Sequence, residues 1–68
     1  MTPSQAAALK WLTDHNGDGC FDKNGVVLAA GEGAPFTRHT WNGLRDLGLV
    51  EFYNPAGKGY GRLKLVRR

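Results

Sequence analysis

The shortness of the chain is the feature that most limits its fold. With 68 residues the chain can form one domain, because chains divide into separate cores only at about 250 to 300 residues. A domain of this size buries only about 60% of the surface that its unfolded chain exposes. The sequence therefore predicts a single compact core over residues 1–68 and no large substrate cavity. An apolar share of 41% is enough for such a core and disfavours disorder.

Cysteine content and hydropathy exclude a disulfide-stabilised protein and a membrane-spanning protein. The single cysteine, Cys20, excludes an internal disulfide framework, and no apolar run approaches the roughly 20 residues that a membrane span needs. The first residues lack the basic start and the long apolar stretch of a secretory signal. We therefore expect a cytoplasmic protein that makes no contact with a membrane.

Charge is distributed unevenly along the chain. Residues 1–34 contain two basic and four acidic side chains, a net charge of −2, whereas residues 35–68 contain seven basic and two acidic side chains, a net charge of +5. Positive charge gathered on one surface attracts polyanions such as nucleic acids, whereas a solvated surface with a basic tail has no such role. The position of the basic residues in the fold decides between these two interpretations.

The first part of the chain predicts one helix followed by turns. Good helix formers run from about Ser4 to His15. Residues 16–19 then end this helix, because Asn and Gly readily adopt left-handed backbone conformations. Residues 20–21 form too short an apolar run for more than an edge strand or a bridge.

Residues 22–31 are open to two interpretations. Asp22 could cap a short helix, or the Asn-Gly pair that follows could be the two-residue turn of a small hairpin. We favour the helix, because Leu28 and the two alanines after it are better helix than strand residues. The segment 31–35 contains two Gly and one Pro and predicts a turn before the next helix.

A third helix is predicted over residues 38–47. Thr37 can cap its start with a hydroxyl that accepts a backbone N–H, and Gly48 is placed to end it. Helical spacing gives this segment two distinct faces. The face expected to pack on the core comprises Trp41, Leu44 and Leu47. The polar face comprises Arg38, Asn42 and Arg45.

The last part of the chain predicts an antiparallel hairpin over residues 50–66. Apolar and polar residues alternate in residues 50–53 and again in residues 62–65, which is the period of a strand with one buried face. The connecting residues between the strands contain three Gly and one Pro. The core-facing side is predicted to comprise Val50, Phe52, Leu63 and Leu65. The outward side is predicted to comprise Tyr53, Arg62 and Lys64.

Residues 36–53, FTRHTWNGLRDLGLVEFY, resemble the recognition helix and first wing strand of winged helix-turn-helix DNA-binding domains in bacterial and phage regulators. The matching residues are Phe36, Thr37, Arg38, Thr40, Trp41, Leu44, Gly48, Leu49 and Val50. The resemblance implies an α+β fold in which a three-helix helix-turn-helix core carries a C-terminal β-hairpin wing. It also implies a duplex DNA-binding module, such as a phage or prophage transcriptional regulator. Such a module reads the major groove with the helix 38–47 and the backbone with the hairpin 50–66.

The polar residues of this region suit two kinds of DNA contact. Arg can bond guanine and Asn can bond adenine through base edges in the major groove, whereas hydroxyl and basic side chains bond phosphate oxygens. The candidates for reading bases are Arg38, His39 and Asn42. The candidates for contact with the phosphate backbone, or with the minor groove near the hairpin loop, are Thr37, Thr40, Arg45, Lys58, Tyr60, Arg62 and Lys64.

Residues 14–22 offer a competing interpretation as a calcium-binding loop. Oxygen-bearing side chains at positions 1, 3, 5 and 9 and a Gly at position 6 match the start of an EF-hand loop. Position 12 is Gly25 instead of the bidentate Glu, and the chain has no second loop to pair with. We therefore favour a helix-ending turn and expect no metal.

A protein-interaction adaptor with the same winged-helix fold is the main alternative to a DNA-binding module. In that case the hairpin edge and the basic face would meet an acidic protein partner. An enzyme is not expected, because no nucleophile, base and orienting acid can be placed together. Cys20 and the two histidines also lack the spacing of a zinc site, so we expect no cofactor.

Overall fold

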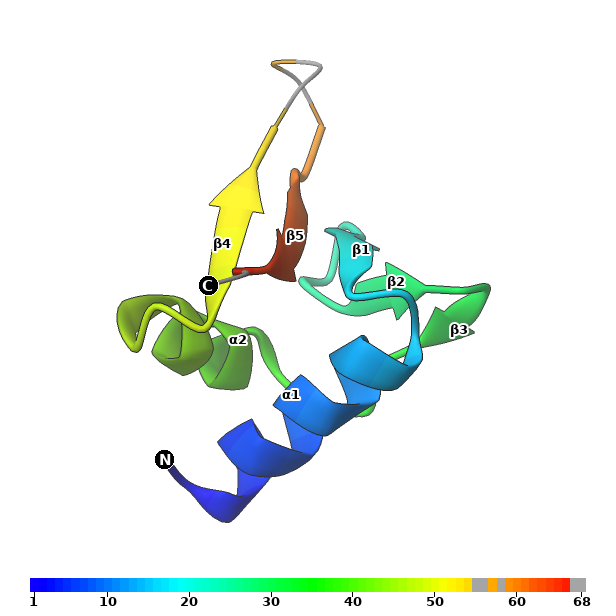
Figure 1. Ribbon diagram of the computed structural model, residues 1–68. Helices are drawn as coiled ribbons and strands as arrows, with labels where there is room; N and C mark the ends of the chain where they lie inside the picture. The colour runs from blue at the N-terminus through cyan, green and yellow to red at the C-terminus, as the bar shows by residue number, and fades with distance from the viewer. Residues whose placement is uncertain (55–56, 58, 67–68) are drawn as a thin grey trace.

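The computed structural model describes residues 1–54, 57 and 59–66. These residues form two helices and a five-stranded antiparallel sheet in the order β3-β2-β1-β5-β4, so the fold class is α+β. Figure 1 shows the two helices on one side of the sheet and the β4–β5 hairpin extending away from them. Neither of the helices in this part of the chain has the length and apolar character that crossing a membrane requires. The elements are α1 (Pro3–Asp14), β1 (Asp18–Phe21), β2 (Val27–Ala29), β3 (Glu32–Gly33), α2 (Arg38–Asp46), β4 (Val50–Tyr53) and β5 (Arg62–Leu65).

Helix α1 agrees with the sequence prediction to within a residue at each end. It begins with a capping box, in which Gln5 N donates to Thr2 Oγ1 at 3.1 Å and Thr2 N donates to Gln5 Oε1 at 2.9 Å. Pro3 occupies the first helical position, where its missing N–H costs no hydrogen bond. The helix is followed by left-handed backbone at Asn16 and Gly17, with φ of 75° and 69°. The predicted helix-ending turn is therefore present.

The predicted helix after Asp22 is wrong, and the hairpin interpretation is correct. Strands β1 and β2 pair antiparallel across this segment. Asp22 Oδ1 accepts hydrogen bonds from the backbone N–H groups of Asn24 and Val26 at 2.8 and 3.0 Å. Gly25 completes the turn with a φ of 77°. The carboxylate thus stabilises a tight turn between two strands instead of the start of a helix.

Strand β2 continues into β3 through a second tight turn. Val27 and Ala29 are buried while the residue between them is exposed, which is strand periodicity. The turn consists of Ala30 and Gly31, whose φ values of 51° and 80° are typical of a type I′ turn. The segment 31–35 was predicted as a turn between two helices, but it contributes β3 instead. The described residues therefore contain two helices where three were predicted.

Strand β1 is the central strand of the sheet, although its length predicted only an edge strand or a bridge. It pairs with β2 on one side and with β5 on the other. Gly19 lies opposite Leu63 in β5, and a Cβ at this glycine would lie 2.8 Å from Cγ1 of Val27. The close approach of neighbouring strands at this point explains the glycine in the middle of the strand.

Helix α2 and the β4–β5 hairpin have the predicted bounds to within a residue, although within the part of the chain that the structure describes the predicted capping hydrogen bond of the Thr37 hydroxyl is not formed. The helix ends in a Schellman motif, in which Gly48 N donates to Arg45 O at 2.9 Å and Leu49 N donates to Leu44 O at 3.1 Å. Gly48 has a φ of 76°, the left-handed conformation that this motif needs. The chain then enters β4, which pairs antiparallel with β5.

The core lies between the helices and one face of the sheet. Its largest fully buried side chains are Trp41, Leu12, Leu44, Leu63, Val27 and Val50. Phe52 and Leu65, which were predicted to face the core, are partly buried and pack against it. Leu47 was also predicted to be a core residue, but it is 49% exposed. It occupies the C-cap of α2, where the chain leaves the helix and the apolar stripe ends.

Candidate nucleic-acid interface

The polar face of α2 lies beside the β4–β5 hairpin. Arg38, Asn42 and Arg45 occupy positions i, i+4 and i+7 of the helix, and Arg38 Nε donates to Asn42 Oδ1 at 3.1 Å. The opposite face, with Trp41 and Leu44, is fully buried. Burial of the apolar face thus fixes which side of the helix is left for a ligand.

Two aromatic rings of the sheet hold Arg38 in place. Its guanidinium carbon lies 4.1 Å from the ring centroid of Phe21 and 4.9 Å from that of Phe52. Arg45 approaches the same Phe52 ring at 4.9 Å. The two rings pack edge to face with their centroids 5.1 Å apart. Stacking engages the flat face of a guanidinium and leaves its in-plane N–H groups for other partners.

An open groove of about 310 Å³ lies between the start of α2 and the hairpin. The residues come from the first position of α2, the end of β1, the end of β4, the start of β5 and the loop that joins β4 to β5. Sheet pairing brings these ends together, since Phe21 N donates to Gly61 O at 3.0 Å. The groove is lined by Phe21, Arg38, Phe52, Tyr53, Asn54, Tyr60, Gly61 and Arg62. It therefore combines four aromatic rings with two guanidinium groups.

Arg62 has an acidic partner on β1. Arg62 Nε donates to the Tyr53 hydroxyl at 3.0 Å and Arg62 Nη2 donates to Asp18 Oδ1 at 3.1 Å. The Tyr53 hydroxyl in turn donates to the Asp18 carboxylate, 2.7 Å from Oδ2. The hydrogen bonds to Tyr53 and then to Asp18 raise the pKa of the Arg62 guanidinium above its ordinary value. The charge that was predicted to contact phosphate is thus paired with a carboxylate of the same chain at the protein surface.

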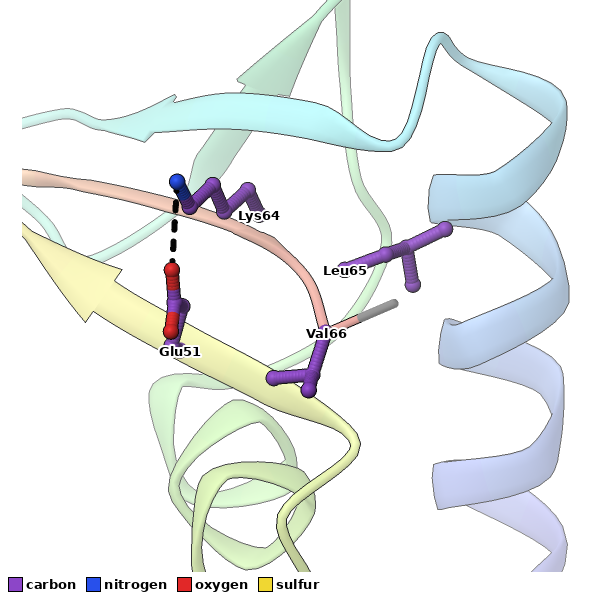
Figure 2. A pocket seen from close by; sticks show the side chains of 4 residues that line it. All are labelled: Glu51, Lys64, Leu65 and Val66. Atoms are coloured by element: carbon purple, nitrogen blue, oxygen red, sulfur yellow. Dashed lines mark ion pairs between the residues drawn. The ribbon is translucent and has the colours of Figure 1, made fainter. Parts of the chain in front are cut away.

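Lys64 lies outside the groove, in a second hollow of about 320 Å³ (Figure 2). Its Nζ is 3.1 Å from Oε1 of Glu51, directly across the β4–β5 pair. Leu65 and Val66 complete the lining, and Figure 2 shows Leu65 directed toward α1. The two predicted phosphate contacts of β5 are therefore both paired with carboxylates.

The remaining predicted site residues lie at the start of α2 and in the hairpin loop. Thr37 is the N-cap residue and is exposed, but among the described residues its hydroxyl makes no capping hydrogen bond. Its Oγ1 lies instead 3.5 Å from Oγ1 of the half-buried Thr40. His39 is exposed on α2 and does not line the groove. Tyr60 is exposed and lines the groove, whereas Lys58 lies outside the described residues.

The acidic residues of segment 14–22 have separate partners. Asp14 Oδ2 lies 2.9 Å from Nζ of Lys10 on α1, Asp18 belongs to the hydrogen-bonded group on the sheet, and Asp22 stabilises its own turn. In the part of the chain that the structure describes, no three His, Cys, Asp or Glu side chains gather as metal ligands would. The geometry of this segment is that of a turn and a strand.

Sequence reasoning missed the aromatic rings of Phe21 and Phe52 that line the groove and the acidic partner of Arg62. The alternation with Val50 predicts that Phe52 faces the core. It gives no sign that the Phe52 ring also contacts the polar face of α2. Phe21 was placed in a run too short for a regular strand. The contact between Phe21 and Arg38 joins residues that are distant in the chain, so no local signal could reveal it.

Comparisons with protein-family models, with curated proteins and with solved structures found no match for this chain.

Proposed function

We propose that the protein is a duplex DNA-binding module that uses α2 as a recognition helix and the β4–β5 hairpin as a wing, as winged helix-turn-helix domains do, but with strands β1, β2 and β3 in place of the second helix. It acts in the cytoplasm as a transcriptional regulator of phage or prophage origin. One observation carries the proposal: the exposed side of α2 and the hairpin border the same groove. The polar residues found on this shared side are Arg38, Asn42, Arg45, Tyr60 and Arg62. In this arrangement α2 enters the major groove and the hairpin follows the backbone.

The fixed position of Arg38 supports a role in base recognition. A flexible arginine loses rotamer freedom when it binds, which weakens binding. Arg38 is already restrained by Phe21, Phe52 and the amide of Asn42. A base contact from a preordered side chain keeps more of its free energy, because less ordering remains to be done on binding.

A protein-interaction adaptor is the second candidate, and two observations favour it. Arg62 and Lys64 are paired with Asp18 and Glu51, which lowers their attraction for phosphate. Among the described residues, β4 pairs with β5 alone, so its other edge is open to an added strand. An extended segment of an acidic partner could pair with that edge through main-chain hydrogen bonds.

A titration of random duplex DNA at two salt concentrations, followed by fluorescence anisotropy, tests the proposal. Binding should weaken steeply with salt, because each phosphate contact contributes about 0.9 to the slope of log affinity against log salt. Arg38→Ala should weaken binding, whereas Lys10→Ala removes the same charge from α1 and serves as the matched control.

The outcome also separates the two candidates. Absence of duplex binding at low salt would reject the DNA proposal, as would equal effects of Arg38→Ala and Lys10→Ala. If acidic peptides that can extend β4 then bind, the adaptor function takes its place.

A further inference from the structure

We infer that the groove between α2 and the β4–β5 hairpin binds one unpaired nucleotide, with its base stacked inside the groove and its phosphate bonded by Arg38. The inference goes beyond the proposed function: it places a ligand with nucleic-acid chemistry on the same side of the molecule, but it does not depend on duplex recognition. It adds the class of ligand: a nucleotide outside a continuous duplex.

The floor of the groove is a guanidinium that is backed by aromatic rings. Phe21 is only 6% exposed, whereas Arg38 is exposed and lies over the rings of Phe21 and Phe52. The guanidinium carbon therefore lies against the two rings, and the same side chain lines the groove. Guanidinium planes that are held in this way are stacking surfaces for unpaired bases.

The wall of the groove provides a second stacking surface. Tyr60 lines the groove and is 63% exposed, although its ring is large and mostly apolar. A base that stacks on this ring would cover it, and such stacking works with every base because each has a π-face. Asn54 adds an amide that can bond polar atoms of the base.

Size and charge favour a single nucleotide over a duplex in this groove. Its volume of about 310 Å³ is close to the lower end of the range for small-ligand sites, about 300 to 1,000 Å³. In the part of the chain that the structure describes, the charge of Arg38 has no acidic partner, in contrast to that of Arg62. Arg38 is therefore the better anchor for a phosphate. A paired base could not stack here, because it is held within the duplex.

The ligand could come from two sources with the same chemistry, a free mononucleotide or an unpaired nucleotide within a single strand. The experiment compares a labelled single-stranded oligonucleotide of about 12 nucleotides, the blunt duplex of the same sequence, and adenosine monophosphate as a competitor. Anisotropy at low salt reports the affinity of each form. Circular dichroism checks that every variant is folded.

The variants separate stacking from general charge. Tyr60→Ala should weaken binding of the single strand about ten-fold, because stacking of a base on an aromatic ring is lost, and Tyr60→Phe should recover most of this loss. Arg38→Ala should also weaken it. Leu47→Ala removes an exposed apolar side chain from the far end of α2 and should leave the affinity unchanged.

Each outcome bears on the inference separately from the proposed function. Competition by adenosine monophosphate would support the site and identify free nucleotides as ligands, whereas binding of the single strand without competition would support the site within a strand. If the duplex binds and the single strand does not, the inference is rejected and duplex recognition stands. If the single strand binds with the expected effects and the duplex does not, the inference stands and duplex recognition is rejected. If Tyr60→Ala leaves the affinity for the single strand unchanged, the groove is also rejected as the binding site.

Discussion

Ala30 holds a backbone conformation that Asn or Gly adopts more easily. Its φ of 51° lies in the left-handed region, and Gly31 follows with 80° in the turn between β2 and β3. A residue with a Cβ loses roughly 1 to 2 kcal/mol in this region, and Asn-Gly is a preferred pair for type I′ turns. We expect Ala30→Asn to raise the free energy of unfolding by about 1 kcal/mol in urea denaturation.

An exposed alanine on α1 provides the control for this substitution. Ala7 is in regular helix, where Asn is less favourable than Ala by up to about 0.7 kcal/mol. Ala7→Asn should therefore lower stability. A loss of stability in Ala30→Asn as well would show that the turn is not of type I′.

Trp41 anchors the core although it lies on the proposed recognition helix. It is fully buried and packs edge to face with Phe36, with the ring centroids 5.9 Å apart. Trp41→Ala should lower the free energy of unfolding by about 3 to 5 kcal/mol, which is comparable to the whole stability of a small domain. Thermal unfolding measures this loss. Leu47→Ala should change stability by less than about 0.5 kcal/mol, and an unchanged melting temperature for Trp41→Ala would contradict the burial.

Among the secondary-structure elements, those with strong local signals were predictable from sequence. Helix α2 has an N-cap threonine and a glycine stop, and the β4–β5 hairpin has a clear period of two. Strand β2 was not predictable, because the helix propensity of Leu28 and its neighbours is overridden by pairing with β1. The turn around Asp22 reverses the chain between β1 and β2. It was not predictable, because Asp is common both at helix N-caps and in turns.

For the candidate site, the face on which each residue lies was predictable from sequence. Helical spacing placed Arg38, Asn42 and Arg45 on one face, and the hairpin period placed Arg62 outward. The partners of these residues were not predictable. Phe21 and Asp18 reach the site only because β1 is inserted in the centre of the sheet, which depends on long-range pairing.

A histidine links the end of α1 to β3, and we expect this link to make stability depend on pH. His15 stacks on Trp11 with ring centroids 3.9 Å apart, its Nδ1 lies 2.6 Å from Trp11 O, and its Nε2 lies 3.1 Å from Glu32 Oε2. Both partners are acceptors, so the doubly protonated imidazolium can donate both bonds. The bond to Trp11 O, followed by the bond to Glu32, raises the pKa of His15 above its ordinary value of 6.5.

The raised pKa of His15 determines whether stability rises or falls with pH. Because the folded state binds the proton more tightly, the stabilisation is fully present below pH 6.5 and is lost as pH rises through the raised pKa of His15. The melting temperature should fall over this interval, and Glu32→Gln should weaken the dependence. His39→Gln, on α2, is the control that should retain it. A melting temperature that rises with pH across the interval would contradict the link.

For the whole molecule, ion pairs across the sheet offset the positive charge of β5. Asp18 compensates Arg62, so its removal should expose a further cation to a nucleic acid. We expect Asp18→Asn to tighten duplex binding and to steepen the salt dependence by up to about 0.9 in slope, since one more phosphate contact becomes available. Anisotropy titrations over a range of salt concentrations measure both effects.

A second acidic residue controls for the change in net charge. Asp14 pairs with Lys10 on α1, so Asp14→Asn alters the total charge by the same amount without releasing Arg62. Equal salt slopes for Asp18→Asn and Asp14→Asn would mean that Arg62 does not contact phosphate.

From the central position of β1 we expect an order of events during folding. Strands β1, β2 and β3 are consecutive and can pair early through tight turns, but β1 must wait for β5, whose Lys64 pairs with Asp18. Closing so long a loop is slow compared with forming a local hairpin. Until it closes, the chain presents an unprotected strand edge, the type of surface through which partly folded chains aggregate. Substitutions that weaken β5 should therefore promote aggregation more strongly than equally destabilising changes in β3.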